Sequence, residues 1–177
     1  SSPSPKPLAQ FLATKPDLNP ADNEGKTPLH AAILAQQADN AIALVKAGAN
    51  PKAVDNIGNT PLHYAAQQGL TTVITALIAQ GADIEAHNND GISSAFMANN
   101  AETINQLKAA GASFEGNTAT GASLIAFLTR RPDKNTVLPM LKSAIEAGAS
   151  LNEVNENGHN ALHLSIRFNS PEISALL

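Results

Sequence analysis

The sequence predicts an all-α solenoid of about five stacked helix-turn-helix units linked by β-hairpin-like turns. Three observations lead to this fold class. The segment Asp22–His30 repeats without a gap at Asp55–His63, with a sequence offset of 33. A Gly-Ala pair recurs along the chain, at Gly48, Gly81, Gly111 and Gly148. Aromatic residues make up only 3% of the chain, which suits helices packed through small side chains. A fixed period of this length is typical of repeat architectures.

The spacing of the glycines shows where the units differ. Each Gly-Ala pair precedes the next turn glycine by the same offset of 10, at Gly58, Gly91, Gly121 and Gly158. The offset from a turn glycine to the next Gly-Ala pair varies instead. It is 23 from Gly25 and from Gly58, 20 from Gly91 and 27 from Gly121. The hairpins therefore keep a constant length, while the helices of the third unit are shortened and those of the fourth are lengthened.

These spacings divide the chain into seven segments. Residues 1–7 are expected to form a flexible leader, and residues 8–21, with Leu8, Phe11 and Leu12, a capping half-repeat. The repeats are predicted at 22–54, 55–87, 88–117 (shortened), 118–154 (lengthened) and 155–177 (incomplete). The sequence stops within a predicted outer helix, so we expect further chain to follow in the natural protein.

Within a unit, local chemistry predicts where each helix starts and ends. Thr27 and Thr60 are predicted N-caps, followed by a proline at the first helical position, where a missing N–H costs nothing. Small and branched residues predict a buried inner helix, at Leu29, Ala32, Ile33, Leu62, Ala65 and Ala66. In the fourth unit we expect the four extra residues to form a longer loop around residues 130–136. Pro132 would end the inner helix, and Thr136 would cap the next one.

The Thr-Pro-Leu-His runs at Thr27–His30 and Thr60–His63, together with the Gly-Ala turns and the 33-residue period, resemble the ankyrin-repeat family. The resemblance extends from about Leu8 to Leu177. It implies a protein-protein interaction module that binds a partner through its hairpin tips and concave inner-helix face. The family's partner-contacting positions correspond here to Asn23, Glu24, Lys26, Asn56, Ile57, Asn59, Gln67, Gln68, Asn89, Asp90, Ile92, Glu156, Asn157, His159, Arg167 and Phe168.

Two features of these positions go beyond the family pattern. Ile57 and Ile92 place apolar side chains on turns expected to be exposed, which indicates either partner contact or ordinary surface residues. The chain has only three arginines, at Arg130, Arg131 and Arg167, and stacking is expected to bring them together on the concave face. Such a patch would bind carboxylates or phosphates. The alternative is a solvated helix end neutralised by Asp133 and Glu172.

The sequence gives no sign of catalytic or metal chemistry. The absence of cysteine excludes disulfides, thiolate zinc sites and cysteine nucleophiles. His30, His63 and His163 lie one repeat or more apart, so we interpret them as structural residues that hydrogen-bond the neighbouring hairpin rather than as metal ligands. The segment starting at Glu153 fails as a calcium loop, because Leu164 stands where a carboxylate is required. We therefore expect no enzyme activity, no cofactor and no metal.

Charge and hydropathy narrow the expected partners. The net charge is −4 and both halves are acidic, so the chain lacks the basic surface that nucleic acids require. It has no apolar run of roughly 20 residues, so no membrane insertion is expected. We expect a monomer that binds another protein, favour a cytoplasmic location and keep open a secreted bacterial effector. Two functional alternatives also stay open: a regulatory or spacer region flanking an enzymatic domain, and a purely structural array.

Overall fold

The computed structural model describes residues 16–114 and 134–150, together with residues 8, 10, 12–14, 152, 154, 158–160, 162, 163 and 166. The helices in these segments are α2 (Pro28–Leu34), α3 (Ala38–Lys46), α4 (Pro61–Gln68), α5 (Thr71–Ala79), α6 (Ser94–Met97), α7 (Ala101–Ala109) and α9 (Lys134–Glu146). The described residues include no β-strand, only an isolated antiparallel bridge between His87 and Ser93. The predicted all-α solenoid is confirmed.

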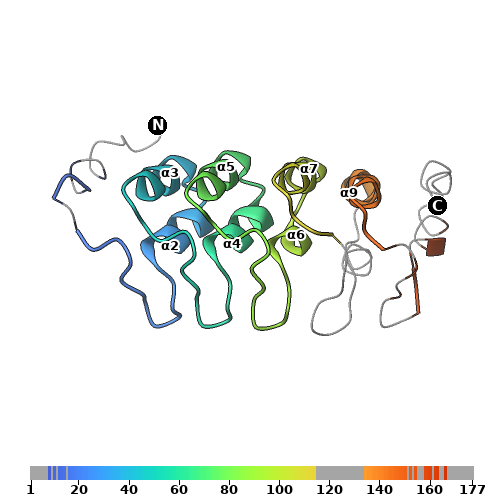
Figure 1. Cartoon of the computed structure of the whole chain (residues 1–177), viewed down its shortest axis with the longest axis horizontal. Coiled ribbons are helices and arrows are strands. Elements are labelled where there is room, and N and C mark those ends of the chain that lie inside the picture. The colour runs from blue at the N-terminus through green and yellow to red at the C-terminus, as the bar shows by residue number, and fades with distance from the viewer. Residues whose placement is uncertain are drawn as a thin grey trace.

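The helices form two rows, with the hairpins extending from one side (Figure 1). The inner row holds α2, α4 and α6, and the outer row holds α3, α5, α7 and α9. Helix α2 packs against its own outer helix α3 and against the next inner helix α4, and α4 packs in the same way against α5 and α6. Because every unit buries its apolar faces against its neighbours, the units stabilise one another rather than folding separately.

The inner helices begin as their sequences predict. Helix α2 follows the N-cap Thr27 and α4 follows the N-cap Thr60, each with proline at its first position. Their apolar residues form the core, with Leu29, Ile33 and Leu62 fully buried. Alanines at 65 and 66 are also fully buried, and their small side chains allow the neighbouring helices to approach closely. Burying a leucine or isoleucine contributes about 1.5–3 kcal/mol, so this row is a main source of stability.

The outer helices complete a continuous core. Their buried residues include Leu44, Val45, Ile74, Leu77, Ile104 and Leu107. Helix α3 packs against α5, and α7 packs against α9. The apolar residues of these helices lie on the side that faces the stack, while residues such as Asn105 on the opposite side are exposed. The outer helices therefore carry an apolar stripe on the side that faces the stack.

The length changes fall at different places in the third and fourth units. Helix α6 has 4 residues where α4 has 8, so the shortening removes the end of the inner helix. The prediction that Thr136 caps a helix was wrong, while residues 130–133 of the predicted loop, with Pro132, lie outside the described residues. Counted back from the Gly-Ala pair, α9 starts at offset 14 from Gly148, whereas α7 starts at offset 10 from Gly111. The four extra residues therefore lengthen α9, and Thr136 lies inside it.

The extra helical turn explains an unusual proline. Pro139 lies inside α9, at the position that Glu102 holds near the start of α7 when both are counted back from the Gly-Ala pair. At such an early position a helix loses no hydrogen bond to proline. In α9 the additional turn precedes it, so Pro139 becomes an interior residue and removes one helical hydrogen bond.

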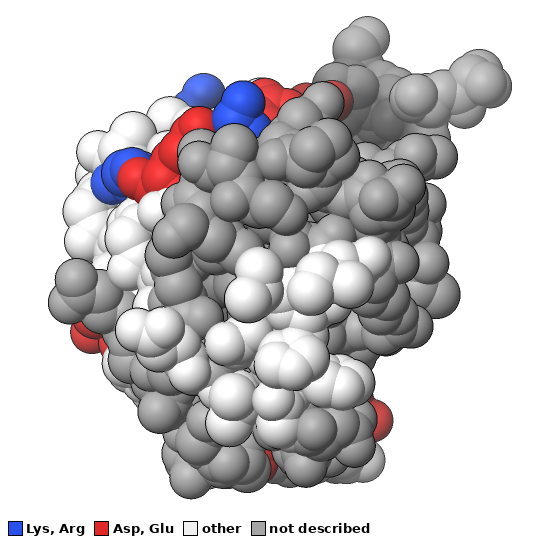
Figure 2. All heavy atoms as spheres, turned by 90° about the vertical axis from the view of Figure 1, so that its right-hand side faces the viewer, with Lys and Arg blue, Asp and Glu red and all other residues white. Residues whose placement is uncertain are grey.

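The end of the stack beyond α9 exposes residues that are buried in the preceding units. Leu162 and Ile166 are 49% and 70% exposed. The matching residues Leu29 and Ile33 of α2 are fully buried, because α4 and its hairpin cover them. Figure 2 shows this end of the stack. Among the described residues there, uncharged ones lie across the middle, and charged side chains lie mainly near the upper edge. No described unit follows to cover it.

Candidate functional site

Neighbouring hairpins are held together by a repeated pair of hydrogen bonds. The backbone N–H of Asn56 donates to the Glu24 carbonyl (2.9 Å), and its side-chain amide donates to the Asn23 carbonyl (3.0 Å). Asn89 repeats this one unit later, with its backbone N–H on the Ile57 carbonyl (3.0 Å) and its side-chain amide on the Asn56 carbonyl (3.1 Å). Both asparagines are exposed, as expected of partner-contacting positions, but their amide N–H groups also fix the spacing of the hairpins.

A buried carboxylate organises the second hairpin. Asp55 Oδ1 accepts hydrogen bonds from the backbone N–H groups of Ile57 (3.1 Å) and Asn59 (2.9 Å). Its Oδ2 accepts a hydrogen bond from the Tyr64 hydroxyl (2.6 Å). Burial, with the bond to Asp55 as the second cause, raises the pKa of Tyr64 above its ordinary value. The carboxylate therefore fixes the turn and the start of α4, and it does not face solvent.

Two residues expected at the binding surface lie elsewhere. Asn59 is only 3% exposed, its Oδ1 accepts from the Asn88 amide (2.9 Å), and its carbonyl lies 3.2 Å from His30 Nε2. Its expected exposure was wrong, because the following hairpin covers it. Ile92 was expected on an exposed turn, but it is half-buried and packs against the core. It occupies the position that Asn59 holds one unit earlier.

The remaining tip residues are available for contact. Ile57 is 56% exposed, and Asp90, the next residue along the row of tips, is also exposed. Sequence reasoning missed a third candidate, Val54, which is 59% exposed on the same hairpin as Ile57. Alignment of the repeats could have found it, since the matching residues of the flanking hairpins are Ala21 and His87, although the fifth hairpin also has a valine there, Val154. The second hairpin thus presents two large apolar side chains to solvent.

The ends of the inner helices carry glutamines. Gln67 is exposed, and Gln68 is half-buried and accepts a hydrogen bond from the Gln36 side chain (2.8 Å). Gln36 was not among the predicted contact residues. Its φ of 56° is left-handed, as is the φ of 68° at Gly69, the matching residue of the next unit. A side chain at this position costs conformational energy, so stability alone would favour glycine here rather than Gln36.

The histidines that close the Thr-Pro-Leu-His runs link adjacent units. In α2, the His30 Nδ1 accepts from the Thr27 backbone N–H (3.1 Å) and Nε2 lies 3.2 Å from the Asn59 carbonyl. In α4, the His63 Nδ1 accepts from the Thr60 backbone N–H (3.1 Å) and Nε2 lies 2.9 Å from the Ile92 carbonyl. Since a carbonyl only accepts, Nε2 carries the proton and each ring is a neutral bridge between two hairpins. The structural interpretation is confirmed for both.

Burial lowers the pKa of both histidines below their ordinary value of 6.5, despite the opposing hydrogen bonds to the Asn59 and Ile92 carbonyls. The unfolded chain therefore binds protons more readily than the folded chain. This contribution to stability is complete above pH 6.5 and is lost as the pH falls from 6.5 toward the lower folded pKa. We expect the free energy of unfolding, measured with urea, to decrease between pH 7.5 and about 5.

A variant identifies the source of this pH dependence. In His30→Gln the titrating ring is absent, so we expect a weaker dependence in the same window, even if overall stability falls. His87→Gln is the matched control, because His87 is exposed on a hairpin. Equal slopes in the wild type and His30→Gln would contradict the assignment.

The other predicted site residues are only partly described. His159 is exposed and its ring stacks on that of His163, with centroids 5.2 Å apart and an interplanar angle of 26°. His163 Nδ1 lies 2.8 Å from Asn160 Oδ1 within its own unit. Arg130, Arg131, Arg167 and Phe168 lie outside the described residues, as do Glu156 and Asn157. The arginine cluster stays a prediction.

Within the described part of the chain, no group of three or more His, Asp or Glu side chains could hold a metal ion. An open hollow of about 350 Å³ lies beside α2 and α3. None of its lining residues can titrate: Leu8, Pro28, Ala31, Ala32, Ala35, Gln37, Asn40 and Leu44. Among the described helices, none is long and apolar enough to cross a bilayer.

Comparison with known proteins agrees with this architecture. Residues 4–88 match a family model that describes three ankyrin repeats. The crystal structure of an ankyrin repeat domain from Acinetobacter baumannii AYE superimposes with a TM-score of 0.82 and 26% identity, covering 97% of this chain and 89% of that one. A second crystallised ankyrin repeat protein gives a TM-score of 0.79 at 22% identity, with the same coverages. No match among curated proteins was found.

Three lines of evidence now agree. The 33-residue period carries the Thr-Pro-Leu-His runs, the helices stack in pairs with hairpins on one side, and the comparisons give the same fold. Ankyrin repeats generally serve as protein-protein interaction modules. Residues 4–88 of this chain therefore match the ankyrin-repeat family model, and the described fold is that of ankyrin repeat proteins.

Proposed function

We propose that this chain is a protein-protein interaction module that binds its partner through the hairpin tips and the inner-helix face. The inner-helix face is the solvent side at the ends of the inner helices α2 and α4, with Ala35, Gln67 and Gln68. This proposal concerns the binding mode in this chain, in which the stack itself makes the contact rather than spacing or flanking another domain.

The contrast between constant and variable repeat positions supports the proposal most directly. Several buried residues are the same in the first two units, as for Leu29 and Leu62 or His30 and His63. The exposed tip residue differs in each of the three described hairpins: Glu24, Ile57 and Asp90. A rigid scaffold that presents chemically different side chains in a row suits recognition of one particular partner surface.

Electrostatics favours a protein partner over a nucleic acid. The chain has 11 basic and 15 acidic residues, and hairpin carboxylates such as Asp90 face solvent. Such a surface repels phosphate groups, so binding to DNA or RNA would lose its main electrostatic contribution. We further propose that the binding unit is a monomer, which light scattering after gel filtration would test directly.

Selection from a displayed peptide library on the immobilised full chain tests the proposed binding mode. Selected ligands are expected to bind the wild type and to lose affinity for Gln67→Arg, because the long charged side chain blocks the inner-helix face. Asn105→Arg is the matched control, since Asn105 is an exposed amide on α7 in the outer row. Ligands affected equally by both changes, or no specific ligand at all, would overturn the proposal.

A further inference from the structure

The three described hairpins differ in charge in an ordered way. Matching segments of equal length lie at 17–26, 50–59 and 83–92. The first has a charge of −2, from Asp17, Asp22 and Glu24 against Lys26. The second is neutral, with Lys52 against Asp55. The third has a charge of −3, from Asp83, Glu85 and Asp90. A neutral hairpin therefore lies between two acidic ones.

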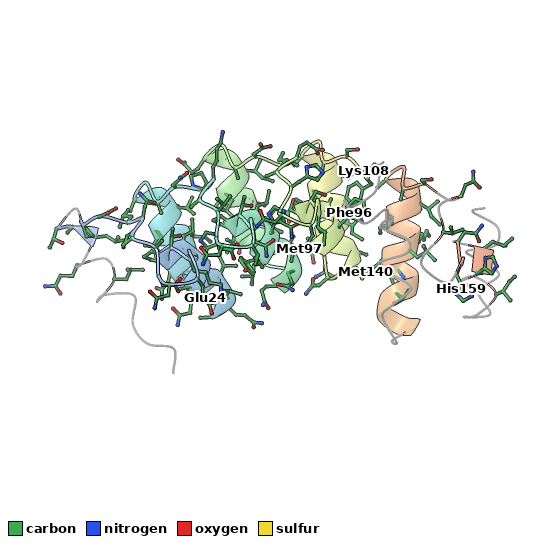
Figure 3. The ribbon with its side chains drawn as sticks, turned by 90° about the horizontal axis from the view of Figure 1, so that it is seen from below. Glu24, Phe96, Met97, Lys108, Met140 and His159 are labelled. Atoms are coloured by element: carbon green, nitrogen blue, oxygen red, sulfur yellow. The ribbon has the colours of Figure 1, made fainter. Side chains whose placement is uncertain are left out.

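The neutral hairpin is also the apolar one. Val54 and Ile57 are the large apolar side chains that it leaves more than half exposed. The matching residues of the flanking hairpins are small or polar, with Glu24 and Asp90 at the position of Ile57. Hydrogen bonds from Asn56 to the Glu24 carbonyl and from Asn89 to the Ile57 carbonyl hold these tips side by side. Figure 3 views the molecule from the hairpin side and labels Glu24.

The carboxylates on either side differ in how far they are neutralised. Glu24 forms an ion pair with Lys26, so the negative charge of the first hairpin is partly neutralised. Asp83 Oδ1 accepts from the Glu85 backbone N–H (3.0 Å) and Glu85 Oε1 accepts from the Ser113 backbone N–H (2.8 Å). Within the described residues, no ion pair reaches the three acids of the third hairpin. Asp55 is buried under its three donors, so the tip of the middle hairpin presents the apolar Val54 and Ile57, and Lys52 is its exposed charge.

We infer that this row of hairpins binds a protein segment in which an apolar side chain is flanked on both sides by basic residues. The apolar side chain would cover Val54 and Ile57, and the basic residues would face the first and third hairpins. Packed repeats lie about 9 Å apart, and a polyproline II chain advances about 3.1 Å per residue with about three residues per turn, which places residues three positions apart on one face. The basic residues would therefore stand about three positions from the apolar one. This inference rests on the proposed function and specifies the partner's chemistry.

A synthetic peptide tests this specification. It carries a central leucine with an arginine at the third position on each side and serine elsewhere, and its binding to the full chain is measured by fluorescence anisotropy. Ile57→Ser is expected to weaken binding at least about tenfold, because the apolar contact is lost. The double variant Glu85→Gln and Asp90→Asn is expected to weaken it about fivefold, and rising salt is expected to weaken wild-type binding.

Matched peptides and variants separate specific docking from general attraction. A peptide with glutamates in place of the arginines is expected not to bind, and one with the arginines next to the leucine is expected to bind less tightly. Asp39→Asn is the control variant, since Asp39 is an exposed acid on the outer helix α3. Equal binding of the acidic peptide, or full affinity in Ile57→Ser, would overturn the inference.

The display selection keeps this inference distinct from the general proposal. Selected ligands that lose affinity in Gln67→Arg but lack basic residues around an apolar one would overturn the inference and leave the interaction module intact. A selection that gives no specific ligand would instead overturn the proposed function. Enrichment of basic residues at three-residue spacing around an apolar residue would support both.

Discussion

Replacing His63 by alanine is expected to lower the free energy of unfolding by about 3 kcal/mol, because a fully buried ring and its hydrogen bonds to two backbone groups are lost. The change leaves the backbone N–H of Thr60 without its acceptor and removes one of the two donors of the Ile92 carbonyl, which keeps the Asn88 backbone N–H (3.0 Å). An unsatisfied buried group such as the Thr60 N–H costs about 1–3 kcal/mol, and the lost bond to Ile92 adds to this cost. Because the ring joins two hairpins, its loss weakens the contact between units as well as the start of α4. Urea unfolding followed by far-UV circular dichroism measures the effect.

The control for this prediction is another histidine of the same region. His87 is exposed on the third hairpin, and His87→Ala is expected to change stability by less than about 0.5 kcal/mol. Hydrogen exchange adds a local readout, since the Thr60 amide should lose protection in His63→Ala but not in His87→Ala. Similar losses of stability in the two variants would show that the bridge contributes little.

Replacing Gly58 by alanine is expected to cost about 3 kcal/mol, from backbone strain and lost contact together. Gly58 has a φ of 79°, and an added Cβ would lie 2.7 Å from the Asn89 backbone N and 2.5 Å from its Oδ1. A left-handed conformation costs a non-glycine residue about 1–2 kcal/mol. The close backbone atom cannot move without shifting the third hairpin and weakening the Asn89 hydrogen bonds. Urea unfolding detects the combined loss.

The variant Gly81→Ala separates the cost of backbone strain from the cost of the lost contact between hairpins. The φ of 83° at Gly81 is almost the same as that at Gly58, but no atom lies within 4 Å of an added Cβ. Gly81→Ala should therefore cost only the backbone strain, about 1–2 kcal/mol. The difference between the two variants measures the contact between hairpins. Equal losses would mean that the hairpins adjust freely, and that their spacing is not fixed as the row of tips requires.

Features that depend on nearby residues could be predicted from the sequence. A threonine before a proline fixes a helix start, and Thr27 and Thr60 are found as the caps of α2 and α4. Glycines end the outer helices and form the turns, because the backbone there is left-handed. The 33-residue period then places Leu29 and Leu62, or His30 and His63, at equivalent buried positions. These properties need only a few neighbouring residues and one repeated pattern.

The candidate site was predicted less completely, because exposure depends on the neighbouring unit. Asn59 and Ile92 are turn residues by sequence, yet the stack encloses the first and half-buries the second. The exposure of Val54 and the hydrogen bond between Gln36 and Gln68 also depend on how neighbouring units pack. The residues next to Asn56 and Asn89 in the sequence do not predict that the N–H groups of these asparagines donate to the preceding hairpin.

The sequence by itself determined the repeat fold, the helix starts, the turn glycines and the register of the core. Only the tertiary structure decided which tip residues face solvent, that the extra residues of the fourth unit lengthen α9, and that an apolar hairpin lies between two acidic ones. The physical reason is distance along the chain. Capping and backbone conformation act within a few residues, whereas burial and surface chemistry arise from packing between units a whole repeat apart.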